Sequence, residues 1–233
     1  MLSADLAGYV IEKKFKSKKN NVFLLNSGQT GTKGKYLVYK EYSCPNRMQK
    51  EVEMLSMLKE NGLPVPEILV TGKDYIGLEY LEGDLLLDCY CDLERTDDLS
   101  IEPLPESAYL FIHALCSWFK KFYQVTGDMT GKRIIMGDVN FRNFIVKDVM
   151  YGIDFEECRE GSIEEEIGSL CAFALTYDPS FTVWKKTMVS ELQRFFIDEL
   201  GLDKELLKKE VENQLLFLAR IRGRSSTGNL PES

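Results

Sequence analysis

The period of the apolar residues changes near residue 82, and this change limits the possible folds more than any other feature of the sequence. Before it, short segments alternate apolar and polar residues, which is the period of a half-buried strand. After it, most long segments repeat their apolar residues at helical spacing. The pattern predicts an α+β, bilobal chain with an antiparallel-sheet lobe over residues 1–82 and a helical lobe over residues 83–233. A cleft suited to a ligand is expected where two such lobes meet.

The sheet lobe is predicted to contain five strands and one helix. The helix over residues 47–61 carries Met48, Val52 and Leu55 at helical spacing, and Gly62 ends it. The strands are expected at residues 9–15, 22–26, 35–42, 68–71 and 75–80. In the second lobe, helices are expected at residues 104–123, 163–175, 181–200 and 204–222, and short strands at residues 133–136, 144–146 and 151–153.

Composition excludes several classes of protein. The formal net charge of -8 argues against a general nucleic-acid binder, which would present a basic face. No apolar run reaches the roughly 18 residues that a membrane span needs. The first residues lack the basic and apolar regions of a signal peptide, and the six cysteines fit free thiols, so a cytoplasmic location is expected. His113 is the one histidine, which makes Ser-His-Asp and zinc-hydrolase mechanisms implausible.

Two short stretches carry the chemistry. Residues 136–146 read MGDVNFRNFIV, and residues 151–156 read YGIDFE. They place Asp138 five residues before Asn143 and, after an apolar strand, Asp154. Kinases use such a set because the first Asp orients an attacking hydroxyl, while the Asn and the second Asp hold metal at the nucleotide phosphates. Oxygen ligands are those that magnesium prefers.

This arrangement resembles the protein-kinase-like superfamily, and within it the aminoglycoside and choline phosphotransferase branch, whose catalytic loops usually read H-G-D-x-x-x-x-N. Met136 stands in place of that His, and Glu156 stands in place of the third residue of the D-F-G signature. The resemblance implies that Asp138 is the catalytic base. It also implies that Asn143 and Asp154 hold Mg²⁺.

The rest of the family pattern occurs in order along the chain. Residues 37–40 read LVYK, similar to V-A-I-K, which implies that Lys40 holds the phosphates of ATP. Glu51, on the following helix, is expected to pair with Lys40, and Glu53 is the fallback. Residues 78–81 read LEYL and resemble the hinge that meets adenine, which implies nucleotide contacts at Glu79 and Leu81.

Two charged segments acquire roles through the same resemblance. The turn at residues 16–21 lies where a kinase covers the phosphates, and Ser17 is expected to contact phosphate there, with Lys18 or Lys19 assisting. Glu166 is expected to accept backbone N–H groups of the loop around Asp138. Taken alone, the lysine run at residues 13–19 and the glutamate run at residues 156–166 are typical of solvated turns or helix faces.

Three functions remain open at this stage. The first is an ATP- and Mg²⁺-dependent transfer of the γ-phosphoryl group to a hydroxyl of a small molecule. The second is a small serine/threonine protein kinase or a partner-dependent ATPase, because the chain's size and basic C-terminal tail are similar to those of KEOPS-type small kinases. The tail at residues 218–224 is then a candidate contact for a protein partner. The third is a nucleotide-binding pseudokinase without turnover.

Overall fold

The computed structural model describes residues 6–17, 19–28, 36–96 and 104–222. The chain forms two compact units. Unit 1 comprises Met1–Asp84 and Ile145–Cys158, and unit 2 comprises Leu85–Phe144 and Arg159–Ser233. The expected boundary near residue 82 lies close to Asp84. Residues 145–158, which were expected in the second lobe, belong to unit 1.

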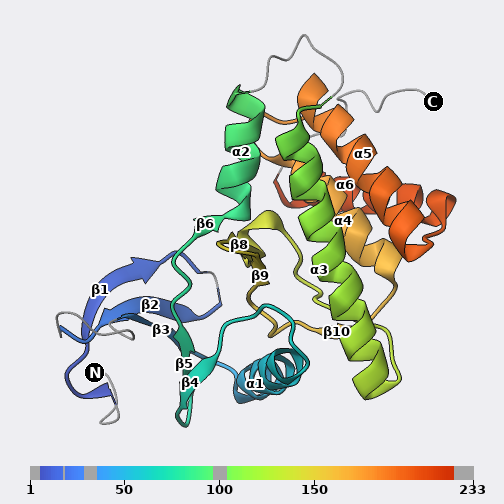
Figure 1. Cartoon of the computed structure of the whole chain (residues 1–233). Helices are drawn as coiled ribbons and strands as arrows, with labels where there is room; N and C mark the ends of the chain where they lie inside the picture. The colour runs from blue at the N-terminus through green and yellow to red at the C-terminus, as the bar shows by residue number, and fades with distance from the viewer. Residues whose placement is uncertain (1–5, 18, 29–35, 97–103, 223–233) are drawn as a thin grey trace. The chain divides into compact units, whose positions relative to one another are not determined.

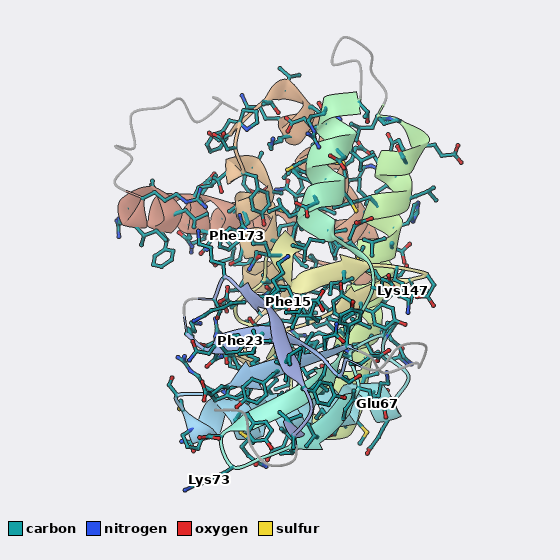
Figure 2. The ribbon with its side chains drawn as sticks, turned by 90° about the vertical axis from the view of Figure 1, so that its left-hand side faces the viewer. Phe15, Phe23, Glu67, Lys73, Lys147 and Phe173 are labelled. Carbon is teal, nitrogen blue, oxygen red and sulfur yellow. The ribbon has the colours of Figure 1, made fainter. Side chains whose placement is uncertain are left out.

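Unit 1 is built on a five-stranded antiparallel sheet with the strand order β1-β2-β3-β5-β4 (Figure 1). The sheet confirms the predicted α+β class, with the sheet in the N-terminal part and helices in the C-terminal part. Phe15 and Phe23 come from its two neighbouring strands β1 and β2 (Figure 2). The strands are β1 (Val10–Phe15), β2 (Asn21–Asn26), β3 (Tyr36–Glu41), β4 (Ile68–Thr71) and β5 (Tyr75–Glu79).

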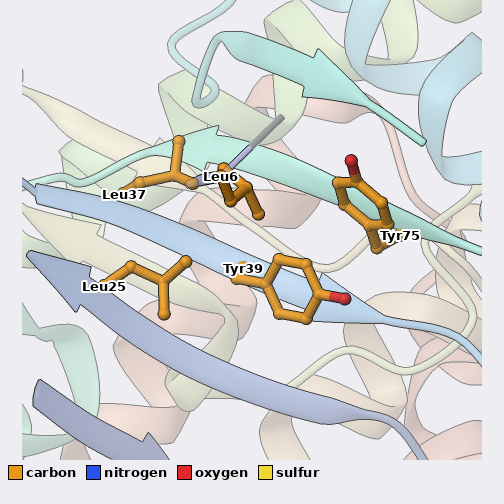
Figure 3. Close-up of a cluster of buried hydrophobic side chains, with 5 residues drawn as sticks. All are labelled: Leu6, Leu25, Leu37, Tyr39 and Tyr75. Atoms are coloured by element: carbon orange, nitrogen blue, oxygen red, sulfur yellow. The ribbon is translucent and has the colours of Figure 1, made fainter. Parts of the chain in front are cut away.

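One face of this sheet carries a core of buried apolar and aromatic side chains (Figure 3). Its members are Leu6, Leu25, Leu37, Tyr39 and Tyr75. Leu37 and Tyr39 are two residues apart on β3, so their side chains leave the same face of the strand. Lys40 follows Tyr39 and therefore leaves the opposite face. The alternation of β3 thus places a lysine on the face away from this core.

The helix α1 (Pro45–Glu60) follows β3 directly. It begins with proline at its first position, where the missing N–H costs nothing, and ends before Gly62, whose φ of 72° suits glycine. Its buried side chains are Met48, Glu51, Met54, Leu55 and Leu58. One of these five is a glutamate. A buried carboxylate needs a partner, because its desolvation is otherwise costly.

The second segment of unit 1 carries β9 (Met150–Gly152), and β8 (Phe144–Val146) precedes it. These two strands form a small sheet with β6 (Asp84–Leu85) in the order β6-β8-β9. The Gly152 N–H donates to the Pro64 carbonyl at 3.1 Å, which ties the segment to the connector after α1. Strand β9 ends at Gly152, so the residues that follow it, including Asp154, are brought to unit 1.

Unit 2 is mainly helical. A 25-residue helix, α3, runs past its predicted end at Tyr123 and stops at Gly131, a left-handed residue. Helix α2 was not predicted: no element was expected between residues 86 and 96. The helices are α2 (Leu86–Thr96), α3 (Glu106–Thr130), α4 (Ile163–Thr176), α5 (Val183–Leu200) and α6 (Lys204–Ile221). The other elements are β7 (Ile134–Ile135), the 3₁₀ turn η2 (Phe141–Asn143) and β10 (Arg159–Glu160).

Side chains at three helix starts satisfy backbone N–H groups there. Ser162, Thr182 and Asp203 accept from the N–H groups of Glu165, Lys185 and Leu206 and so begin α4, α5 and α6. Lys185, which is fully buried, forms an ion pair with Glu94 of α2. Helices α4 and α6 pack so closely at Gly168 that a Cβ there would lie 2.7 Å from Cβ of Glu210. Within the described residues, no helix is both long and apolar enough to cross a membrane.

Candidate functional site

Lys40 lies at the centre of the site in unit 1. Its Nζ donates to Glu51 Oε2 at 2.6 Å and to Asp154 Oδ1 at 2.7 Å, and it lies 3.6 Å from Glu156 Oε2. Lys40 is only 6% exposed. Burial opposes the charged ammonium, but the three neighbouring carboxylates outweigh it and raise the pKa of Lys40. The lysine is therefore a fixed positive charge.

Glu51 receives two hydrogen bonds on one oxygen. Lys40 Nζ and the Tyr42 hydroxyl both donate to its Oε2, each at 2.6 Å. Burial raises the pKa of Glu51, whereas these two hydrogen bonds act to lower it. Glu53, the fallback, is exposed and accepts from Gln49 at 2.8 Å. Of the two expected candidates, the structure brings Glu51 to Lys40.

Asp154 and Glu156 follow β9 and reach Lys40 from the second segment of unit 1. Asp154 has a φ of 68°, in the left-handed region that few non-glycine residues adopt. Such backbone strain is found at functional sites more often than elsewhere. Phe155 between them is fully buried and anchors the turn. The strained turn thus presents two carboxylates beside one lysine.

Three carboxylates surround one ammonium in this cluster. Each of Glu51, Asp154 and Glu156 offers an oxygen, and these oxygens all lie within 4.8 Å of one another. The Asp154 side chain is 40% exposed, whereas those of Glu51 and Glu156 are nearly buried. Carboxylate oxygens in such a set suit a hard divalent cation, and Asp154 is the member that solvent reaches. We call Lys40, Glu51, Asp154 and Glu156 the lysine–carboxylate cluster.

The turn between β1 and β2 is joined to the residues that follow Asp154. Asn20 Nδ2 donates to Glu156 Oε2 at 2.5 Å, and Lys19 Nζ pairs with Glu157 at 2.7 Å. Arg47 of α1 also pairs with Glu157, at 3.1 Å. The expected phosphate contact Ser17 accepts from the Asn20 N–H at 3.4 Å, so its hydroxyl shapes this turn. Lys18 lies outside the described residues.

The expected hinge residues lie at the end of β5. The Glu79 N–H donates to the Glu67 carbonyl at 2.8 Å, and its carboxylate accepts from the Glu67 N–H at 3.2 Å and from Lys59 at 3.4 Å. These contacts fasten the end of β5 to the start of β4. Leu81 is buried.

The loop with Asp138 and Asn143 belongs to unit 2. Asn143 Nδ2 donates to the Asp138 carbonyl at 2.6 Å, and Asn143 is 8% exposed. This bond uses the amide nitrogen and leaves Oδ1 of Asn143 as an acceptor or metal ligand. The Asn140 side chain accepts from the Arg142 N–H at 2.9 Å and starts the turn η2. The loop is therefore closed by its own side chains.

Glu166 of α4 holds the start of the same loop. Its Oε1 accepts from the N–H groups of Met136 at 2.6 Å and Gly137 at 3.2 Å, and its Oε2 accepts from the Tyr123 hydroxyl at 2.7 Å. These are the backbone contacts expected of Glu166. Burial raises its pKa to about 7, although the three hydrogen bonds act to lower it.

The interpretation of the glutamate run as a solvated face is wrong for two of its members. Glu156 is 3% exposed and Glu166 is 2% exposed, because each carboxylate has donors within the protein. Sequence reasoning also missed Tyr42 and Asn20. Glu156 could have been named as a candidate, because it lies two residues after Asp154. The direction of its side chain could not be predicted, because it depends on the left-handed conformation of Asp154.

Comparison with known proteins adds no relative to this picture. No protein-family model matches the chain. No curated protein matches it with significance. The function of the chain is therefore inferred from its own residues.

Proposed function

We propose that this chain is an ATP-dependent phosphotransferase with a bilobal protein-kinase-like fold, which transfers the γ-phosphoryl group of ATP to a hydroxyl group. The observation that carries the proposal is the buried Lys40 ammonium among the carboxylates of Glu51, Asp154 and Glu156. A lysine fixed by a helix glutamate beside an aspartate after a short strand is the arrangement with which kinases hold phosphates and metal. Strongly perturbed groups gathered in this way favour a functional role over a structural one.

Lys40 supplies positive charge to the nucleotide phosphates in this proposal. Glu51 orients the Lys40 ammonium. Because both side chains are buried, solvent screens their ion pair little. The ammonium also pairs with Asp154 at 2.7 Å. Phosphates that approach Lys40 therefore take over part of its coordination and release the more exposed carboxylate.

Asp154 and Asn143 are the proposed ligands for Mg²⁺. The residues fit the ion, because both offer hard oxygens and the lysine–carboxylate cluster holds three carboxylates against one ammonium. The ion would supply positive charge that neutralises the nucleotide phosphates. The amide nitrogen of Asn143 is held by the Asp138 carbonyl, which fixes the orientation of its free oxygen.

Asp138 is the proposed base for the acceptor hydroxyl. Its backbone is fixed on both sides, because Asn143 binds its carbonyl and Glu166 binds the N–H groups of the two preceding residues. Such preorganisation is most of what an enzyme contributes to phosphoryl transfer, where positioning and electrostatics dominate. The acceptor hydroxyl donates its proton to the Asp138 carboxylate, and the oxygen of the acceptor attacks the γ-phosphorus. The bond from that phosphorus to the bridging oxygen breaks, and ADP leaves.

The test is magnesium-dependent ATP turnover by the full chain, with ATP binding measured separately by calorimetry. The acceptor panel contains aminoglycosides, amino alcohols, sugars and a generic protein. We expect Asp138→Asn to abolish turnover and to keep ATP binding, while Asp154→Ala loses the magnesium-dependent part of binding. Asp128→Asn is the matched control, because Asp128 lies on the exposed surface of α3 and should keep both activities.

Each result selects one reading. Turnover that requires one small acceptor and vanishes in Asp138→Asn establishes a small-molecule kinase. Self-phosphorylation or acceptor-independent ATP hydrolysis favours a protein kinase or a partner-dependent ATPase. Binding without turnover in all assays favours a pseudokinase or an acceptor outside the panel. Full turnover in Asp138→Asn refutes the assignment of the base, and a wild-type chain that does not bind ATP refutes the proposal.

A further inference from the structure

We infer that Tyr42 is a positioning residue of this site, whose hydroxyl holds the Glu51 carboxylate so that Glu51 can keep Lys40 on the nucleotide phosphates. The inference rests on the proposed function and adds a residue to it. Neither the strand pattern nor the motif spacing pointed to Tyr42, which lies just beyond β3. Its position is defined by three contacts in unit 1.

The first contact is the hydrogen bond to Glu51. The Tyr42 hydroxyl donates to Glu51 Oε2 at 2.6 Å, the same length as the bond from Lys40 Nζ to that oxygen. A short hydrogen bond to a buried, ionised oxygen is among the stronger ones in proteins. Tyr42 is 5% exposed and Glu51 is 1% exposed, so water does not replace this donor easily.

The second contact is with Lys40 itself, and the third is with the sheet. Lys40 Nζ lies 5.2 Å from the centroid of the Tyr42 ring, within the range of a cation–π interaction. The Tyr42 N–H donates to the Asp74 carbonyl at 2.8 Å, which fixes the backbone of Tyr42 beside β5. Tyr42 therefore touches both members of the Lys40–Glu51 pair from a rigid position.

Tyr42 matters because Glu51 and Asp154 compete for the Lys40 ammonium. Lys40 divides its hydrogen bonds between Glu51 at 2.6 Å and Asp154 at 2.7 Å. The hydroxyl of Tyr42 stabilises the charged form of Glu51, and burial opposes that form. Without the hydroxyl, Glu51 is a weaker partner and Lys40 shifts toward Asp154. The lysine then occupies the carboxylate that the proposed Mg²⁺ needs.

The first part of the test compares Tyr42→Phe with the wild type. The substitution keeps the ring and the cation–π contact and removes only the hydroxyl. We expect about 10-fold weaker binding of ATP with Mg²⁺ in calorimetry, the usual size of one lost hydrogen bond to a charged group. Tyr39→Phe is the matched control, because the Tyr39 side chain leaves β3 on the face opposite Lys40, and its substitution should leave ATP binding unchanged.

The second part separates a positioning role from a general structural one. In a Glu51→Gln background, Tyr42→Phe should have no further effect on ATP affinity, because the hydroxyl acts through the carboxylate.

The outcomes distinguish the inference from the function on which it rests. One outcome overturns the positioning role and leaves the proposed function standing. In it, the wild type binds ATP, and Tyr42→Phe lowers ATP affinity as much in the Glu51→Gln background as in the wild type. An unchanged ATP affinity in Tyr42→Phe does the same. A wild-type chain that binds no ATP overturns the proposed function and this inference together. Melting temperatures of all variants show whether a lower affinity reflects partial unfolding.

Discussion

Removal of the Lys40 charge is the most direct test of the lysine–carboxylate cluster, because it can be measured on the free protein. In Lys40→Met, three carboxylates with oxygens within 4.8 Å of one another lose their common cation. Breaking a buried ion pair typically costs about 3–5 kcal/mol. The Asp154 side chain is 40% exposed, so solvent screens its share and the lower end of this range applies.

We therefore expect Lys40→Met to lower the free energy of unfolding by about 3 kcal/mol near pH 7. For a chain of this size, that loss corresponds to a melting temperature lower by about 6–12 °C. Urea denaturation followed by circular dichroism measures the first quantity, and calorimetry measures the second. Lys59→Met is the matched control, because the Lys59–Glu79 pair is half-exposed and should contribute less than about 1 kcal/mol.

The sign of the pH dependence follows from the crowded carboxylates. Without Lys40, repulsion and burial hold the folded-state pKa of Glu51 above its unfolded value. Such a group stabilises the fold below its unfolded pKa, and this stabilisation is lost as pH rises through the folded pKa. The defect of Lys40→Met should therefore shrink as the solution is acidified.

Magnesium should act in the same direction as acid. If Mg²⁺ binds only the folded protein, a Mg²⁺ concentration 100 times its dissociation constant raises the free energy of unfolding by about 2.7 kcal/mol. This gain would offset most of the loss caused by Lys40→Met. A defect no larger than that of Lys59→Met would refute the electrostatic reasoning. A large defect that is equal at all pH values would refute it as well, because it would indicate lost packing instead of lost charge.

Three further perturbations test other parts of the structure. Burial raises the pKa of Glu166 from 4.5 to about 7, so its contribution to stability is lost as the pH rises from 4.5 to 7. Glu166→Gln should therefore make the free energy of unfolding, measured by urea denaturation, less dependent on pH in this range. Lys185→Met and Glu94→Gln should each cost about 3–5 kcal/mol, while the double substitution costs less than their sum; additive losses would argue against the buried pair. Gly168→Ala should lower the melting temperature because its Cβ would lie 2.7 Å from Cβ of Glu210, and an unchanged value would mean that α4 and α6 separate easily.

Much of the fold follows from local sequence patterns. The strands of the main sheet and helix α1 lie within a few residues of their predicted positions, because alternation and helical spacing are local properties. Helix α2 was missed because its eleven residues carry only two buried side chains, Leu86 and Tyr90, too few to show a period. The end of α3 was misplaced because the helix continues to the glycine at residue 131.

The site was predictable where a motif fixes one residue and unpredictable where long-range contacts decide. Lys40 and Glu51 are eleven residues apart on a strand and the next helix, and the resemblance to kinases was enough to pair them. Asn20 and Glu156 are 136 residues apart, and no local pattern joins them. Tyr42 was overlooked for another reason. A tyrosine near a strand end fits an ordinary core position, and only the structure reveals which oxygen its hydroxyl meets.

The two-segment composition of unit 1 has a consequence for biosynthesis. Lys40 and Asp154 are 114 residues apart, with a large part of unit 2 encoded between them. At about 5–20 residues per second, a ribosome needs roughly 6–23 s to add that stretch. During this interval the nascent lysine has Glu51 as a partner but not Asp154 or Glu156. The charge balance of unit 1 is therefore completed late in synthesis, and its last strand and acidic turn arrive only after α3 has been made.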